Sequence, residues 1–153
     1  MVITFCGHSN YAGFMGDEER LLTLLEEVIC GKNVDFYLGG YGDFDGFALK
    51  CATRYKQRHI NARLVFITPY LGNWLKDRKC FLEKNYDEIV FPNIEHVPQK
   101  YAITKRNEWM VDNSDFVFAY VQTHFGGAYK TLLYAKKRKK PYINLYQGMY
   151  ELY

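Results

Sequence analysis

The sequence has no apolar run long enough to span a bilayer, which takes about 20 consecutive apolar residues in a helix. Its first apolar stretch, Val2–Phe5, is too short for a signal peptide and leads directly into Gly7-His8. We therefore expect a cytoplasmic protein without a membrane partner. The 4 cysteines form no Cys-x-x-Cys pair and the histidines have no ligand spacing. These absences predict reduced, mostly buried cysteines and no metal site.

Several catalytic and nucleotide-binding motifs are also missing. There is no G-x-S-x-G, no Walker A loop and no G-x-G-x-x-G, which disfavours a serine hydrolase, a P-loop enzyme and a dinucleotide-dependent dehydrogenase. The net charge of +3 is too small to indicate a nucleic-acid-binding protein. The one basic run, 136–140, complements the dipole at a helix C-terminus and lacks interleaved aromatic residues. Nucleic acid is accordingly an unlikely partner.

What is present is the composition of one soluble globular domain. The 153 residues are 48% hydrophobic and 24% charged, which is enough apolar material for a real core. We assign the whole chain, 1–153, to one domain and give its aromatic tail, 146–153, no role. Aromatic residues make up 18% of the chain. Tyrosine is frequent at ligand sites and subunit interfaces, so we expect a homodimer or higher homo-oligomer.

Short apolar runs alternate with helical patterns along the chain. Continuous apolar strands separated by helices are typical of a parallel sheet covered on both faces. The fold class is therefore α/β, a doubly wound, mostly parallel Rossmann-like sheet with helices on both faces. The expected strands are 2–6, 36–38, 64–68, 88–91, 116–121 and 142–145, and the expected helices are 17–30 (stopped by Gly31), 44–55 (capped by Asp43), about 74–82, 101–113 and 127–139.

Two glycine turns follow predicted strands. Gly39, Gly40 and Gly42 come after one strand, and Gly126 and Gly127 come after another. Glycine lets backbone N–H groups approach a ligand, and the N-terminus of the following helix attracts anions. Ligands of such sheets bind beyond the carboxyl ends of the strands, so both turns should meet there. This arrangement predicts phosphate binding, against the simpler alternative of tight strand-to-helix packing.

Three side chains near these turns have two interpretations each, and a fourth has one. His8, after Gly7, can contact phosphate or transfer a proton, or it can hold its loop by a backbone hydrogen bond. Asp45 can cap its helix or accept a hydrogen bond from a ribose hydroxyl. Arg106 can grip a phosphate, or pair with Glu108 or Asp112 along its helix. Asp43 is most simply a cap.

The joint pattern resembles the SLOG superfamily, and within it a small bacterial branch of relatives of the YpsA protein. The resemblance extends from Met1 to about Leu145. It rests on Gly7-His8, on Leu38-Gly39-Gly40-Tyr41-Gly42-Asp43-Phe44-Asp45, on the run Arg106-Asn107-Glu108-Trp109-Met110-Val111-Asp112-Asn113-Ser114-Asp115, and on Gly126-Gly127-Ala128-Tyr129-Lys130-Thr131.

The resemblance implies a Rossmann-like protein that binds a nucleotide or an ADP-ribose-like ligand, with no certain cofactor. It also implies kinship with LOG-type phosphoribohydrolases, in which an arginine precedes a Gly-Gly-x-Gly-Thr turn that catalytic glutamates follow. Arg106, Gly126 and Gly127 match that pattern, whereas Thr131 is shifted and no glutamate follows. N-glycosidic hydrolysis is therefore the alternative function, with Asp45 as substitute carboxylate and Arg106 as its partner. The predicted ligand-binding set is Gly7, His8, Gly39, Gly40, Gly42, Asp45, Arg106, Gly126, Gly127 and Thr131.

Overall fold

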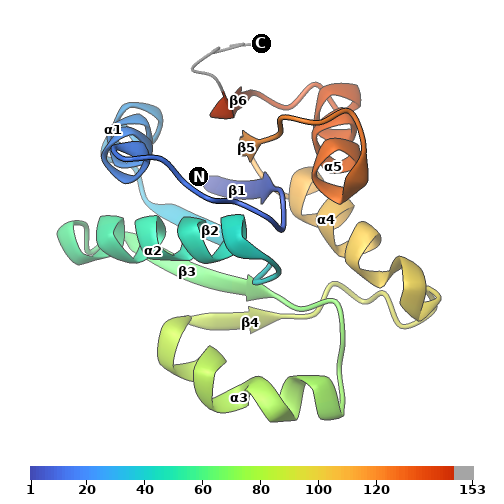
Figure 1. Ribbon diagram of the computed structural model, residues 1–153. Helices are drawn as coiled ribbons and strands as arrows, with labels where there is room; N and C mark the ends of the chain where they lie inside the picture. Colours follow the sequence, from blue (N-terminus) through green and yellow to red (C-terminus); the bar gives the residue numbers. More distant parts are fainter. Residues whose placement is uncertain (147–153) are drawn as a thin grey trace.

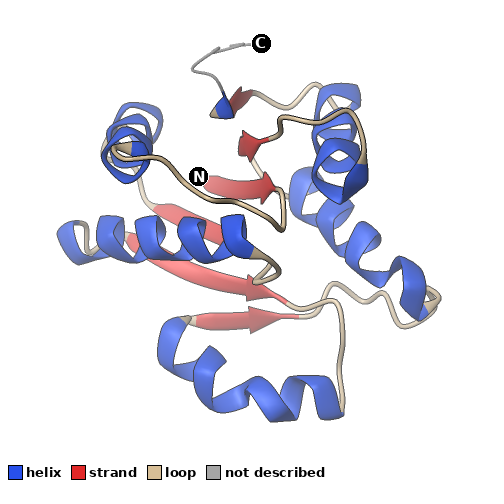
Figure 2. Ribbon diagram, in the orientation of Figure 1, coloured by secondary structure: helices blue, strands red, loops and turns tan. Residues whose placement is uncertain are grey.

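A computed structural model describes residues 1–146 and contains a six-stranded parallel sheet in the order β4-β3-β2-β1-β5-β6. Helices cover both faces of this sheet (Figures 1 and 2), which confirms the predicted doubly wound α/β class. The strands are β1 (Val2–Gly7), β2 (Val34–Leu38), β3 (Ala62–Ile67), β4 (Glu88–Val90), β5 (Phe116–Tyr120) and β6 (Tyr142–Asn144). The aromatic tail beyond 146 lies outside the described residues.

The helices alternate with the strands as the sequence pattern predicts. They are α1 (Asp17–Ile29), α2 (Asp43–Arg58), α3 (Asn73–Asn85), α4 (Ala102–Asp112) and α5 (Gly126–Lys137), with a short 3-10 helix, η1 (Gln99–Tyr101), before α4. Helix α3 is longer at both ends than the expected 74–82. None of the helices within residues 1–146 has the length and apolar character that a membrane crossing requires.

The alternation of side chains along the strands divides the core between the two faces. In β5, Phe116 and Phe118 join the cluster that packs against α1 and α2, while Val117 and Ala119 pack against α4 and α5. Both sets are buried, which explains why the strand reads as a continuous apolar run. The chain leaves β1 toward one face and β5 toward the other, so a switch point lies between these neighbours.

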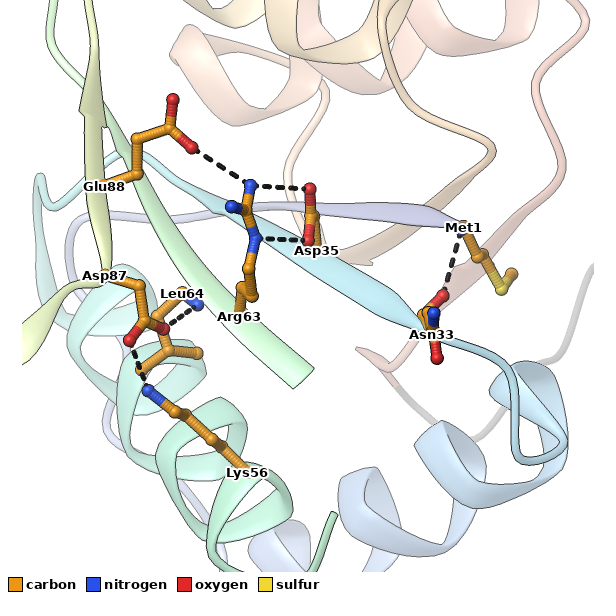
Figure 3. Close-up of polar contacts among 8 residues, drawn as sticks. All are labelled: Met1, Asn33, Asp35, Lys56, Arg63, Leu64, Asp87 and Glu88. Atoms are coloured by element: carbon orange, nitrogen blue, oxygen red, sulfur yellow. Dashed lines mark hydrogen bonds and ion pairs between the residues drawn. The ribbon is translucent and has the colours of Figure 1, made fainter. Parts of the chain in front are cut away.

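A polar network joins the amino ends of β2, β3 and β4, at the edge opposite to the glycine turns (Figure 3). Arg63 pairs with Asp35 and Glu88, one on each neighbouring strand. Asp87 accepts the Leu64 N–H at 2.7 Å and also pairs with Lys56 of α2. These contacts align the strands at their beginnings and leave the carboxyl edge for a binding site.

Two local expectations were wrong, those for Asp43 and for the exposed cysteines, and the expected glycine stop of α1 was confirmed. Helix α2 begins after Gly42, which occupies the N-cap position, so Asp43 is the first helical residue and caps nothing. Helix α1 ends at Ile29, because Cys30 and Gly31 both adopt positive φ. Cys6 and Cys51 are buried as expected, but Cys30 and Cys80 are exposed, and all four are free thiols.

Candidate functional site

A cleft of about 440 Å³ opens at the carboxyl ends of β1, β2 and β5. Its floor is the end of β1, and its walls are the loops after β2 and β5 together with the facing sides of α4 and α5. This is the position expected for a ligand in a doubly wound sheet. Of the predicted site residues, the cleft brings together Gly7, His8, Gly39, Asp45, Arg106, Gly126, Gly127 and Thr131.

The first turn of α5 presents bare backbone to this cleft. Gly126, at φ +89°, and Gly127 open the helix, and a Cβ atom added to either would meet nothing within 4 Å. The N-cap residue, Phe125, supplies no side-chain acceptor. The N–H groups at the start of a helix have no carbonyl partner within it, and the helix dipole makes this end positive. The turn therefore has the geometry of an anion site.

Arg106 of α4 lies behind that turn and is only 1% exposed. Its Nη1 donates to two backbone carbonyl oxygens, those of Gly39 at 2.8 Å and Ile67 at 2.7 Å. Its Nε donates to the Asn107 side-chain oxygen at 2.9 Å. The expected alternative, an ion pair along the helix surface, is wrong, because this side chain points inward and clamps the ends of β2 and β3.

The remaining nitrogen of the Arg106 guanidinium, Nη2, has no hydrogen-bond acceptor among residues 1–146. Arg106 is one of the residues that line the cleft. Burial lowers the pKa of Arg106, and the nearby Asp45 carboxylate opposes that shift. An arginine stays protonated at physiological pH, so the cleft holds a buried positive charge with an unused donor.

Two side chains connect Arg106 to α5. The Asn107 amide nitrogen donates to the Thr131 hydroxyl at 3.4 Å, and that hydroxyl donates to the Gly127 carbonyl at 2.9 Å. Thr131 lies one helical turn after Gly127 in α5, and its hydroxyl group binds the Gly127 carbonyl from within the helix. This contact couples the orientation of the arginine to that of the open amides.

His8 holds its neighbouring loop. Its Nε2 accepts the backbone N–H of Gln122 at 2.9 Å, which fixes the start of the loop that leads to α5. Burial lowers the pKa of His8, which favours the neutral imidazole that such an acceptor requires. Of the two interpretations, the structure supports the loop contact, although the ring also lines the cleft.

Asp45 is the one carboxylate among the described residues that line the cleft. Its Oδ2 accepts the Tyr41 N–H at 2.7 Å, which is a contact with the turn before α2 and not with an amide of the helix. Burial raises the pKa of Asp45 to about 6, against the opposing effects of the Tyr41 N–H and the Arg106 charge. Asp45 and Arg106 thus face one cleft without a direct ion pair between them.

The glycines of the first turn are required by packing. A Cβ at Gly40, which has φ +63°, would lie 2.5 Å from the Phe66 ring, and one at Gly42, at φ +93°, would lie 2.6 Å from the Ser9 Cα. Neither residue lines the cleft, so the structure leaves them out of the predicted binding set. In the same test, a Cβ added at Gly7 would overlap the Phe44 ring. This turn follows the simpler packing alternative, whereas the α5 turn is open.

The sequence reasoning missed most of the polar and aromatic residues on the loops around the cleft. Those loops have no periodicity, and only the glycines stood out in them. A second hollow, of about 540 Å³, lies beside α3 and is lined by Tyr70, Trp74 and Phe91. Within residues 1–146 no group of three His, Cys, Asp or Glu side chains is placed to hold a metal ion. The cleft residues outside the predicted set are Phe5, Cys6, Ser9, Asn10, Tyr41, Ile103, Asn107, Met110, Gln122, Thr123, Phe125 and Ala128.

Comparison with known proteins supports the fold and leaves the ligand open. No protein-family model matches the sequence. The chain is 29% identical over 140 residues to the uncharacterized SPbeta prophage-derived protein YoqJ of Bacillus subtilis (strain 168), covering 78% of this chain and 80% of that protein.

Two solved structures share the architecture. DNA processing protein A from Helicobacter pylori, which binds single-stranded DNA, superposes with a TM-score of 0.65 at 17% identity, over 94% of this chain. The chain spans 64% of that protein's length. The Moco carrier protein of Chlamydomonas rheinhardtii superposes with a TM-score of 0.51 at 13% identity, over 94% of this chain and 74% of its own. At these identities the likeness establishes the Rossmann-like fold alone.

Proposed function

We propose that this chain is a SLOG-type protein that binds a nucleotide or a nucleotide derivative, with a phosphate seated on the first turn of α5. The observation that carries the proposal is the pairing of two independent features in one cleft. A Cβ at Gly126 or Gly127 would meet open space, and the buried Arg106, whose Nη2 has no acceptor among residues 1–146, lines the same cleft. Amides at a helix N-terminus and an arginine fork both suit phosphate oxygens.

The electrostatics of the cleft are consistent with an anionic ligand. The α5 dipole and Arg106 contribute positive potential, and burial lowers the pKa of His8, which favours its neutral form. The single lining carboxylate, Asp45, has a pKa raised to about 6 by burial, so part of its charge is lost in mildly acidic solution. The fold likeness to DNA processing protein A adds support for a nucleotide-like ligand. It also weakens the expectation that nucleic acid is not a partner, so a short oligonucleotide belongs in the ligand panel. The placement near the YpsA protein and the homo-oligomeric state stay predictions.

Gly127→Glu tests the proposal directly. A side chain at this position has room, and an acidic residue in the first turn stabilises a helix, so the variant should fold. Its carboxylate would occupy the anion position and repel phosphate. Gly46→Glu is the matched control, because Gly46 is an exposed helical glycine of α2 with equally free space and does not line the cleft.

Thermal shift and calorimetry against phosphate, ribose 5-phosphate, AMP, ADP, ADP-ribose and a short oligonucleotide give the readout. We expect binding of at least one phosphate compound by the wild-type protein and the Gly46→Glu variant, and its loss in Gly127→Glu. Equal binding by all three proteins, or no binding of any compound at millimolar concentration, would rule the proposal out.

One observation favours a second function, hydrolysis of the N-glycosidic bond of a nucleoside monophosphate. Asp45 and Arg106 face the same cleft, and a carboxylate near the sugar is what an oxocarbenium-like transition state requires. Incubation with nucleoside monophosphates, followed by chromatography for free base, tests it. Product that disappears in Asp45→Asn while AMP still binds would support hydrolysis, and no product from wild-type protein would exclude it for the nucleotides used.

A further inference from the structure

Among the described residues, six of the nine exposed large apolar side chains belong to the edge of the sheet where the cleft lies, and the other three are Ile60, Phe81 and Leu133. Large apolar residues with more than a third of their surface exposed occur on all five strand-to-helix connections at that edge. A folded domain gains nothing from leaving such side chains in water, and their clustering marks an interaction site. The residues are Phe14 and Met15 after β1, Tyr41 after β2, Leu71 after β3, Tyr101 before α4 and Phe125 after β5.

Two of these side chains line the cleft itself. Tyr41 is 62% exposed and Phe125 is 75% exposed. Their loops follow β2 and β5, which lie on either side of β1 (Figure 1), so the two residues belong to loops on opposite sides of the strand whose end forms the cleft floor. No other aromatic side chain that the structure describes both lines this cleft and is exposed.

Neither ring is explained by the stability of the fold. Phe125 occupies the N-cap position of α5, where Ser, Thr, Asp or Asn would satisfy an amide, and its ring is not buried in exchange. Tyr41 has its backbone N–H held by Asp45 at 2.7 Å, which fixes the turn while the ring projects into solvent. Both rings are therefore exposed at defined backbone positions, one in the turn that Asp45 holds and one at the start of α5.

We propose that Tyr41 and Phe125 bind the base of the ligand by stacking, so that the cleft selects base-bearing phosphate esters such as nucleoside monophosphates over sugar phosphates. The inference rests on the proposed function, because the phosphate on α5 places the base between the two loops. The side-chain amides of Asn10 and Gln122 also line the cleft, and they supply the neutral donors and acceptors that suit base edges. A volume of about 440 Å³ suits a ligand of this size.

The test compares AMP with ribose 5-phosphate by calorimetry, because the two share the phosphate and the sugar and differ in the base. In wild-type protein AMP should bind more tightly. Tyr41→Ala and Phe125→Ala should each weaken AMP binding by about tenfold and leave ribose 5-phosphate unchanged. The separate variants Tyr41→Phe and Phe125→Trp keep an aromatic ring and should bind AMP with the affinity of the wild-type protein. Phe81→Ala is the matched control, since Phe81 is 56% exposed on α3 away from the cleft.

The outcomes separate this inference from the phosphate site. Equal affinity for AMP and ribose 5-phosphate, or equal weakening of both by the ring variants, would overturn base stacking and leave the phosphate site standing. A loss of AMP affinity in Trp74→Ala, with the ring variants unchanged, would place the base in the hollow beside α3 instead. If no phosphate compound binds, the proposed function fails and the base assignment fails with it.

Discussion

Replacing Arg106 by alanine tests whether this residue ties the sheet edge together. In the folded protein its Nη1 satisfies two carbonyl groups on different segments, those of Gly39 and Ile67. Removing the donor leaves both acceptors in a buried setting, and each unsatisfied acceptor costs about 1–3 kcal/mol. Two such acceptors together would cost about 2–6 kcal/mol. Water entering from the cleft will hydrogen-bond to them in part, so we expect a loss of stability in the lower half of that range.

We therefore expect Arg106→Ala to lower the free energy of unfolding by about 2–4 kcal/mol. For a domain of this size the melting temperature should fall by roughly 5–15 °C. Urea denaturation followed by circular dichroism measures the first quantity, and a thermal scan measures the second. Lys105→Ala is the neighbouring control, because Lys105 is exposed and pairs only with Glu108 along the helix. Its loss should cost about 0.5 kcal/mol or less.

A variant within about 0.5 kcal/mol of wild type would refute the clamp, since that is the scale of an ordinary surface substitution. Arg106→Lys refines the result. It retains the positive charge but lacks the planar fork, so we expect a stability between those of wild type and the alanine variant. Weaker phosphate binding in Arg106→Lys at unchanged stability would separate the ligand contact from the clamp.

Three further predictions follow from individual contacts. Gly40→Ala should destabilise the protein by about 1–3 kcal/mol, because positive φ and the Phe66 ring both oppose a side chain, whereas Gly127→Ala should be neutral or stabilising by up to about 1 kcal/mol. Parallel urea titrations measure both, and equal effects would contradict the contrast between a packed and an open turn. Asp45→Asn should bind phosphate compounds severalfold more tightly than wild type above pH 6, where the carboxylate is ionised, and about equally at pH 5. Calorimetry with cyclic AMP, whose phosphate does not titrate in this range, gives the ratio, and a ratio independent of pH would be inconsistent with it. The third prediction concerns Asp87. Burial tends to raise the pKa of its carboxyl group, but the Lys56 contact and the Leu64 N–H outweigh burial and hold that pKa below its usual range. Its ionised form therefore stabilises the fold above the unfolded-state pKa, and that stability is lost as pH falls through the folded-state value. We expect Asp87→Asn to cost about 1 kcal/mol at pH 7 and less below pH 4, measured by denaturation at both values.

The parallel sheet and the edge at which the candidate site lies were predictable from the sequence, and the contacts of individual side chains in that site were not. Apolar runs such as Phe116–Val121 read correctly as buried parallel strands, because both faces of the sheet are covered. The convergence of His8, Gly39 and Gly126 followed from the rule that parallel strands end at one edge. The inward direction of Arg106 did not follow, since an arginine in a helix is expected on the exposed face. Only the carbonyls of Gly39 and Ile67, far away in the chain, decided it.

The sequence by itself determined that this chain is a doubly wound α/β protein with glycine turns gathered at one edge of its sheet, because hydrophobic periodicity and backbone freedom are local properties. The tertiary structure alone decided which turn is open. A glycine reads the same in the sequence whether its missing Cβ makes room for a neighbouring side chain, as at Gly40, or leaves space at a helix end, as at Gly127. That difference depends on what other segments place beside the backbone, and the proposed phosphate site on α5 rests on it.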